Sequence, residues 1–171
     1  MMNNAVILLE PEIPQNTGNI ARTCAATGTE LILIRPLGFS IDEKSVRRAG
    51  LDYWNKLTLR VYDSFGEYMA DSEGAVRFFL STKAPRSYTE TAYPTPFHLI
   101  FGKESAGIPE TILNDHIDSC FRIPMLPEIR SLNLSNSVAV VLYEALRQHD
   151  FGPMQKAGKL RFNSRNSVEI H

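Results

Sequence analysis

At 171 residues, 43% of them hydrophobic and 22% charged, the chain has the composition of a folded globular protein, which excludes an intrinsically disordered one. This length predicts one domain that is large enough to bury a core without disulfides or metals. The 18 basic and 19 acidic residues nearly cancel to a formal net charge of −1, so the total charge carries no footprint for nucleic acid or an anionic membrane.

Short apolar runs alternate with helix-like segments along the chain. Continuous apolar runs, as opposed to alternating ones, indicate strands that are covered on both faces and therefore a largely parallel sheet. Strands are predicted at residues 5–9, 31–34, 57–61, 75–80, 98–101 and 121–125. Helices are predicted at residues 16–27, 64–70, 109–113 and 133–148.

This alternation predicts an α/β fold with a mostly parallel sheet and helices on both faces, formed by residues 1–150. Residues 151–171 have little periodic apolar content, so they are predicted to be a polar, basic tail that is flexible or loosely docked. Periodicity favours core packing over a partner contact for the apolar residues of the last helix, Val138, Val141, Leu142 and Leu146.

Residues that pair as disulfides or bind metals are few. Cys24 and Cys120 both lie in apolar surroundings, which favours buried, reduced thiols. The chain has no CxxC pattern and its four histidines are scattered, so no metal site is expected. The N-terminus lacks the basic residues of a signal peptide and no run approaches the ~20 apolar residues of a membrane helix, which predicts a soluble, cytoplasmic protein.

Three stretches place small polar residues at strand ends, where ligands collect in open α/β sheets. The first, PEIPQNTGNIART at residues 11–23, puts Asn16 at a predicted helix start, whose unpaired N–H groups attract anions. Arg22 follows within two helical turns, so both residues could sit near one opening and contact a phosphate or ribose. On residue types alone, a helix cap and a surface arginine are the simpler interpretation.

The second stretch, FGKESAGIP at residues 101–109, lies between a predicted strand and a predicted helix. Its glycines allow close backbone approach, and Glu104 lies in the turn. The glycine spacing matches neither the dinucleotide fingerprint nor a P-loop, so binding of a dinucleotide or a nucleoside triphosphate is not supported. A structural turn and a ligand-binding turn are equal alternatives here.

The third stretch, IPMLPEIRSLNLSNSVAV at residues 123–140, opens a helix with Ser131, Asn133, Ser135 and Asn136. This helix start carries hydroxyls and amides but no carboxylate, which suits a ligand carboxylate or phosphate. Four such residues exceed what one cap needs, which favours a binding role. The chain shows no nucleophile signature, so a reaction here would depend on positioning and cofactor chemistry.

In order and separation, these stretches resemble the three motifs of the SPOUT superfamily of RNA methyltransferases, over residues 5–148. The segments EPEIPQNTGNIAR, RPLGFS and RRAGLDYW make the chain most similar to the TrmL (YibK-like) tRNA ribose 2′-O-methyltransferases. The resemblance implies a C-terminal trefoil knot, a homodimer and S-adenosylmethionine as cofactor. It implies 2′-O-methylation of tRNA, at the wobble C or U of leucine tRNAs.

The resemblance also implies roles for individual residues. Catalytic or ribose-contacting roles fall to Asn16, Arg22 and Asn133. Cofactor contacts fall to Leu80, Gly102, Glu104, Ile123, Met125, Ser131 and Leu132. RNA contacts are expected at Arg22, Arg47, Arg48 and Arg130.

Arg22 matches the residue that is proposed as the base in the family, which is chemically awkward because a guanidinium stays protonated, with a pKa above ~12. We instead expect a bidentate clamp on a phosphate, which places the ribose 2′-hydroxyl and stabilises developing negative charge. The proton would then leave late in the reaction, or to water.

Other functions stay open at this point. The methyl acceptor could be another RNA, or the protein could be a non-catalytic RNA-binding or assembly factor. A nicotinamide-dependent dehydrogenase is disfavoured because the glycine fingerprint is missing.

The charges are segregated although they cancel overall. Residues 44–60 carry five basic residues and one acidic residue, and residues 151–171 carry four basic residues and one acidic residue. Charge runs usually form solvated faces. Beside a ribose site, however, the two basic segments could follow RNA phosphates, and RNA binding would then depend steeply on salt.

Overall fold

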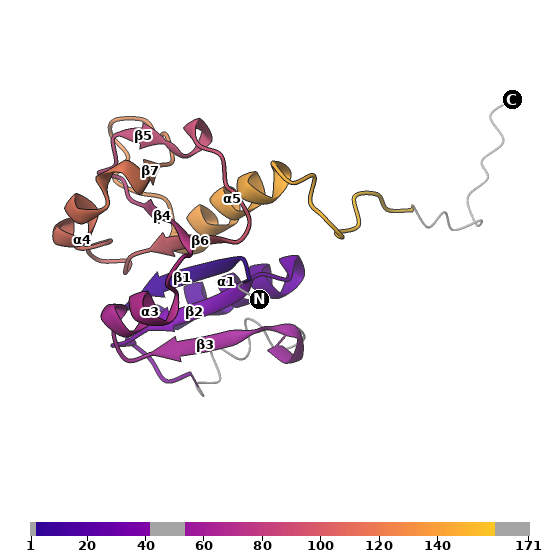
Figure 1. Ribbon diagram of the computed structural model, residues 1–171, viewed down its shortest axis with the longest axis horizontal. Helices are drawn as coiled ribbons and strands as arrows, with labels where there is room; N and C mark the ends of the chain where they lie inside the picture. Colours follow the sequence, from indigo (N-terminus) through magenta and orange to yellow (C-terminus); the bar gives the residue numbers. More distant parts are fainter. Residues whose placement is uncertain (1–2, 42–53, 160–171) are drawn as a thin grey trace, which may run out of the picture.

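The computed structural model describes residues 3–41 and 54–159, which are built around a seven-stranded sheet (Figure 1). The strands lie in the order β3-β2-β1-β6-β4-β7-β5, and each neighbouring pair runs parallel. Their bounds are β1 (Ala5–Leu9), β2 (Glu30–Ile34), β3 (Leu59–Tyr62), β4 (Val76–Leu80), β5 (Arg86–Ser87), β6 (Phe97–Phe101) and β7 (Cys120–Arg122). Because the strands are parallel, their carboxyl ends meet at one edge of the sheet.

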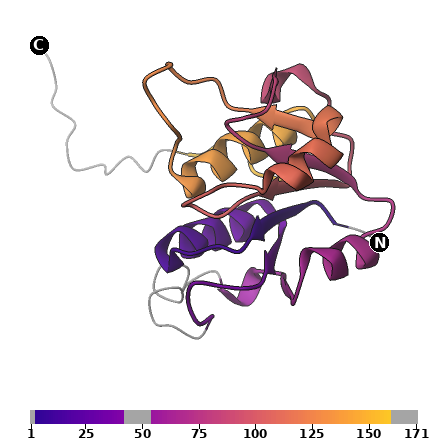
Figure 2. The ribbon, with the colours of Figure 1, turned by 90° about the vertical axis from the view of Figure 1, so that its left-hand side faces the viewer.

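Helices cover both faces of the sheet (Figure 2). Two long helices, α1 (Pro14–Thr27) and α5 (Leu134–Arg147), pack on one face, and two short helices, α3 (Phe65–Asp71) and α4 (Glu110–Asp115), pack on the other. Single turns of 3-10 helix lie at η1 (Trp54–Lys56), η2 (Tyr88–Glu90) and η3 (Ile117–Ser119). Both faces of the central strands are therefore buried, which explains their continuous apolar sequences.

The predicted α/β fold is confirmed, and each predicted strand and helix is present, the strand at residues 5–9 with the predicted ends and the others with shifted ends. The strand predicted at residues 121–125 already ends at Arg122. The two-residue β5 was not predicted, because so short a segment carries no periodicity. Helix α1 begins at Pro14, not at residue 16, and its N-cap Ile13 makes no side-chain cap bond. Asn16 is thus inside the helix, and the expectation that it belongs to the cap is wrong.

The predicted core contacts are confirmed. Both cysteines are free and buried. Four apolar residues of α5 are at most 8% exposed: Val138, Val141, Leu142 and Leu146. Beyond α5, Phe151 and Met154 pack against the same core cluster, so the start of the predicted tail is docked. No helix in the described ranges is long and apolar enough to cross a bilayer.

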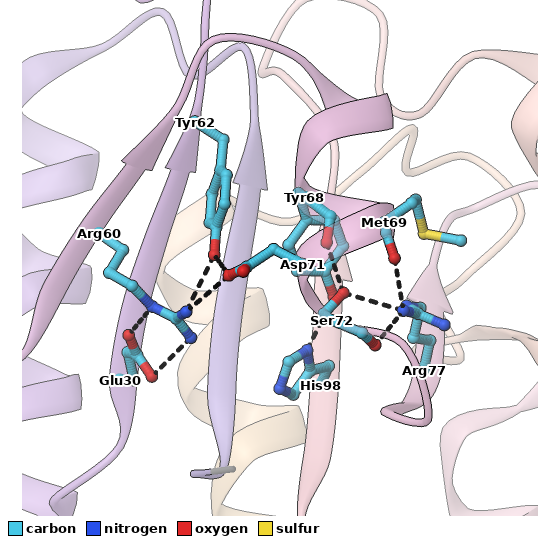
Figure 3. A network of polar contacts seen from close by, with 9 residues as sticks. All are labelled: Glu30, Arg60, Tyr62, Tyr68, Met69, Asp71, Ser72, Arg77 and His98. Atoms are coloured by element: carbon cyan, nitrogen blue, oxygen red, sulfur yellow. Dashed lines mark hydrogen bonds and ion pairs between the residues drawn. The ribbon is translucent and has the colours of Figure 1, made fainter.

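A polar network lies between the sheet and α3 (Figure 3). Glu30, which is only 4% exposed at the start of β2, forms an ion pair with Arg60 of the edge strand β3. The Tyr62 hydroxyl donates to Asp71 at the end of α3. These bonds connect the edge strand β3 to its neighbour β2 and to the end of α3.

His98 is a buried titratable group of this network, and its burial predicts a pH dependence of stability. Its side chain is fully buried, and its Nδ1 lies 2.8 Å from the Tyr68 hydroxyl. Burial, assisted by the nearby Arg77 guanidinium, lowers the pKa of His98 to about 4. Unfolded histidine has a pKa of ~6.5, so between the two values the unfolded chain binds a proton that the folded chain does not.

We therefore expect the free energy of unfolding to be highest above pH ~6.5 and to fall by as much as about 3 kcal/mol as the pH drops to about 4. Urea unfolding at pH 7, 6 and 5 measures the slope above the range in which carboxylates titrate. His98→Gln is the control: it lowers stability at every pH but removes most of this slope. A slope that is unchanged in His98→Gln would contradict the assignment.

Candidate functional site

A cavity with a volume of about 570 Å³ opens at the carboxyl edge of the sheet, beside α5. Its walls come from the ends of β4 and β6, the turn after β6, the segment after β7 and the first turn of α5. This is the edge at which the sequence places the three polar stretches.

Most of the predicted site residues meet at this cavity. It is lined by Asn16, Leu80, Gly102, Glu104, Ile123, Met125, Arg130, Ser131, Leu132 and Asn133. Arg22 is not among the residues that line it: this residue lies on an exposed side of α1, so its contact with a phosphate or ribose stays a prediction. Arg47 and Arg48 lie outside the described residues.

The Glu104 carboxylate binds the segment that leads into α1. Oε2 accepts a hydrogen bond from the backbone N–H of Glu12 at 2.8 Å, and Oε1 accepts one from that of Ile13 at 3.3 Å. Oε1 also accepts the side-chain amide of Asn16 at 3.0 Å. The N–H groups before this helix start therefore bind a carboxylate of the protein itself, that of Glu104.

Asn16 connects this carboxylate to α5. Its Oδ1 accepts a hydrogen bond from Asn133 Nδ2 at 3.0 Å, while Asn133 Oδ1 accepts the backbone N–H of Ser135 at 2.9 Å. Asn133 is thus both the N-cap of α5 and a cavity wall. Because each amide binds on both sides, the two side chains are held in fixed orientations.

A second set of contacts joins the same two segments, with the carboxylates now on the segment after β1 and the donors on the turn after β6. Glu12 accepts hydrogen bonds from the backbone N–H of Ser105 at 2.9 Å and from its hydroxyl at 2.8 Å, which lowers the pKa of the Glu12 carboxyl. Lys103 Nζ lies 2.8 Å from Glu10. Sequence reasoning missed these residues, although two acidic residues directly after the first strand could have drawn attention to them.

Gly102 is the most tightly packed position of the turn. A Cβ atom added here would lie 2.0 Å from the carbonyl carbon of Gly107 and 2.2 Å from the backbone nitrogen of Ile108. Gly107 has a φ of +70° and bonds back to Lys103 O at 2.8 Å, which closes the turn. The stretch is therefore a structural turn that also forms a cavity wall, and its role in ligand binding stays a prediction.

The lining suits an organic ligand with an apolar ring and a polar end. Leu80, Ile123, Met125 and Leu132 supply apolar surface, and the start of α5 supplies hydroxyl and amide groups. Within residues 3–41 and 54–159, His, Cys, Asp and Glu form no cluster of three that could hold a metal ion.

Comparison with known proteins agrees with this geometry. The family model described as the SpoU rRNA Methylase family matches residues 3–143. The chain belongs to this family. As a SpoU methylase it is an enzyme of the methyltransferase class, and its solved neighbours are RNA methyltransferases of the SPOUT type.

Three relatives of this SpoU methylase are informative. A Methylovorus glucosotrophus protein named tRNA (cytidine(34)-2′-O)-methyltransferase is 46% identical over 147 residues, which cover 85% of this chain and 96% of that protein. A structure described as giving insights into 2′-OH methylation of C/U34 on tRNA is 44% identical, covers 85% of this chain and 95% of its own, and superposes with a TM-score of 0.82.

The third relative was solved with a bound molecule. The SpoU methyltransferase AviRb from Streptomyces viridochromogenes, in complex with the cofactor AdoMet, is 26% identical with a TM-score of 0.76. The match covers 88% of this SpoU methylase and 62% of AviRb.

Proposed function

We propose that this SpoU methylase transfers a methyl group from S-adenosylmethionine to the ribose 2′-oxygen of the wobble nucleotide, C or U, of tRNA. The observation that carries the proposal is the meeting of ten predicted site residues at one cavity in a chain whose relatives are named for this reaction. Leucine tRNAs are the substrates that the sequence resemblance favours.

The cavity fits the cofactor. A volume of about 570 Å³ lies within the range of sites for ligands of this size, and its apolar walls with few polar groups suit an adenine ring and an amino-acid end. Leu80, Ile123, Met125 and Leu132 would hold the ring, while Ser131, which lines the same cavity, would contact the amino-acid end. When bound, S-adenosylmethionine supplies a methyl group on a positively charged sulfur, ready for transfer.

The residues around the cavity align the reaction without acting as nucleophiles. Glu104, Asn16 and Asn133 fix the turn after β6 against the starts of α1 and α5. Arg22 is the group that we assign to the RNA phosphate, since its permanently charged fork binds phosphate but cannot accept a proton.

A C-terminal trefoil knot belongs to the proposal. β7 lies between β4 and β5 in the sheet, although both precede it in the chain. The segment after β7 leads into α5, which packs on the face of the sheet that α1 covers. Placing a late strand between two earlier ones supports a chain that threads through its own loop, an exceptional topology.

A homodimer is also proposed, and the surface supports it. Apolar side chains at least 38% exposed lie in the segment before α5 and along α5 itself: Leu126, Ile129, Leu132, Val140 and Tyr143. Covering these residues with a second copy would remove apolar surface from water. In such a dimer, Arg22 would serve the cavity of the partner, which accounts for its place outside its own.

The remaining predictions concern the RNA and the cell. Arg130 is exposed and lines the cavity, and its contact with an RNA phosphate stays a prediction. The domain boundary at residue 150 and the cytoplasmic location stay predictions, and the basic segments lie mostly outside the described residues.

Methyl transfer from labelled S-adenosylmethionine tests the proposal. Bulk tRNA from a strain that lacks the gene should accept label, and nucleoside mass spectrometry should place it as 2′-O-methylcytidine or 2′-O-methyluridine at the wobble position. tRNA from the parent strain, already methylated, is the matched control and should accept little. Label in another RNA would favour the alternative target, and no transfer to any RNA would favour a binding factor.

A further inference from the structure

A second, smaller cavity opens at the same edge of the sheet but on the opposite face. It has a volume of about 170 Å³ and lies between the ends of β1 and β2 and the starts of α3 and α4. Its apolar surface comes from Leu9, Ile34, Phe65, Pro109 and Ile112. The first two are at most 5% exposed, so the cavity floor is part of the core.

Only the turn after β6 separates this small cavity from the cofactor cavity. Lys103 and Gly107, which close that turn, line both of them. A ligand in the small cavity would therefore lie next to the reaction site, yet on the far side of the sheet edge. None of the contacts argued above for the cofactor or the ribose uses this cavity.

The side chains around the small cavity are suited to a flat ring. Phe65 is half-buried, and its own ring is held by Tyr68, with ring centroids 5.8 Å apart. Arg35 is exposed beside it. Aromatic rings and arginine guanidinium planes are the groups on which proteins stack unpaired RNA bases.

The charges at the rim argue for a neutral ligand. Each cation is already paired with a carboxylate: Lys103 with Glu10 at 2.8 Å, and Arg35 with Asp63 at 3.2 Å. A phosphate placed here would meet two carboxylates along with the two cations, whereas a neutral base finds both hydrogen-bond donors and acceptors. The volume is also below that of sites for whole cofactors.

We propose that the small cavity binds one unpaired base of the RNA substrate, a neighbour of the nucleotide whose ribose is methylated. This inference rests on the proposed function, because it takes the target ribose to lie at the cofactor cavity. The wobble position lies in a single-stranded loop, so its neighbours are free to turn outward into a pocket. The small cavity would thus help to choose which RNA loops are accepted.

The affinity of the protein for RNA stem–loops tests whether the small cavity binds a base. A fluorescently labelled RNA stem–loop with the target nucleotide in its loop is compared with copies that lack one neighbouring base each. Loss of the recognised base should weaken binding to the wild-type protein about tenfold, the scale of one base stacked on an aromatic ring. In Phe65→Ala, loss of that same base should make no further difference, because its stacking surface is already gone.

A matched pair of variants isolates the stacking group. Arg35→Gln and Asp63→Asn both break the ion pair between these residues, but only the first removes the guanidinium plane. Arg35→Gln should reduce the discrimination against the missing base, and Asp63→Asn should keep it. Affinity for S-adenosylmethionine, measured by calorimetry, should stay unchanged in Phe65→Ala and so exclude a collapsed site.

The outcomes separate this inference from the proposed function. Wild-type protein that methylates tRNA but binds every base-deleted RNA equally well would overturn the small-cavity proposal alone. Discrimination that persists in Phe65→Ala would overturn it as well. Wild-type protein that neither binds nor methylates tRNA would overturn both proposals.

Discussion

Gly102→Ala is expected to weaken the binding of S-adenosylmethionine by about 10- to 100-fold, the equivalent of about 1–3 kcal/mol of overpacking. The added Cβ would lie 2.0 Å from Gly107 C and 2.2 Å from Ile108 N, and both atoms belong to the backbone. No side-chain rotation can relieve this contact, so the turn from Gly102 to Gly107 has to move out of the cavity wall. Isothermal titration calorimetry gives the affinity.

Gly66→Ala is the matched control for that substitution. Gly66 lies in α3, and the nearest heavy atom to its added Cβ is Ser64 Oγ at 3.9 Å, an ordinary contact. Alanine should raise the stability of this helix by up to about 1 kcal/mol and leave cofactor binding unchanged. Normal cofactor affinity in Gly102→Ala would show that the turn does not form the site.

Arg22→Lys is expected to lower kcat by about 100- to 1000-fold, the scale of losing one positioned group that stabilises developing charge. Lysine keeps the charge but loses the two-pronged guanidinium that grips a phosphate. Cofactor affinity should stay normal, because Arg22 does not line the cavity. Single-turnover kinetics measures the rate, and Arg147→Lys, an exposed arginine paired with Glu144, is the control that should change little.

Mixed dimers test whether Arg22 acts across subunits. Glu104→Gln weakens the bonds to Glu12 N and Ile13 N and should impair the cavity of its own chain. A dimer of one Arg22→Lys chain and one Glu104→Gln chain would hold one intact site, with the cavity from the first chain and the arginine from the second. Activity should therefore return on mixing. Failure to recover it would place Arg22 in the site of its own chain.

The fold could be predicted because its signals are local. Continuous apolar runs mark strands that are covered on both faces, and the spacing of apolar residues along α5 marks its buried side. The ends of the strands were predicted less accurately than their presence. For example, β7 ends at Arg122, although the apolar sequence continues into Ile123. Ile123 is apolar for a reason other than strand packing, because it lines the cavity.

The candidate site could be predicted only in part. Small polar residues at strand ends pointed to the correct edge, and the motif resemblance picked out residues such as Glu104 and Asn133. The pairing of Glu12 with Ser105 could not be predicted, because it joins residues 93 positions apart through ordinary carboxylate and hydroxyl groups. The position of Arg22 outside the cavity depends on the rotation of α1 about its axis, which depends on packing against α5.

The bond between Asn16 and Asn133 spans 117 positions of the chain. During synthesis on the ribosome, the amino-terminal half of the sheet emerges long before Asn133 does, so a nascent chain has strands but no finished cavity. Competence for methyl transfer therefore arises late, together with the last helix. A protein truncated before α5 would lack both this bond and the wall of the cavity that the start of α5 supplies.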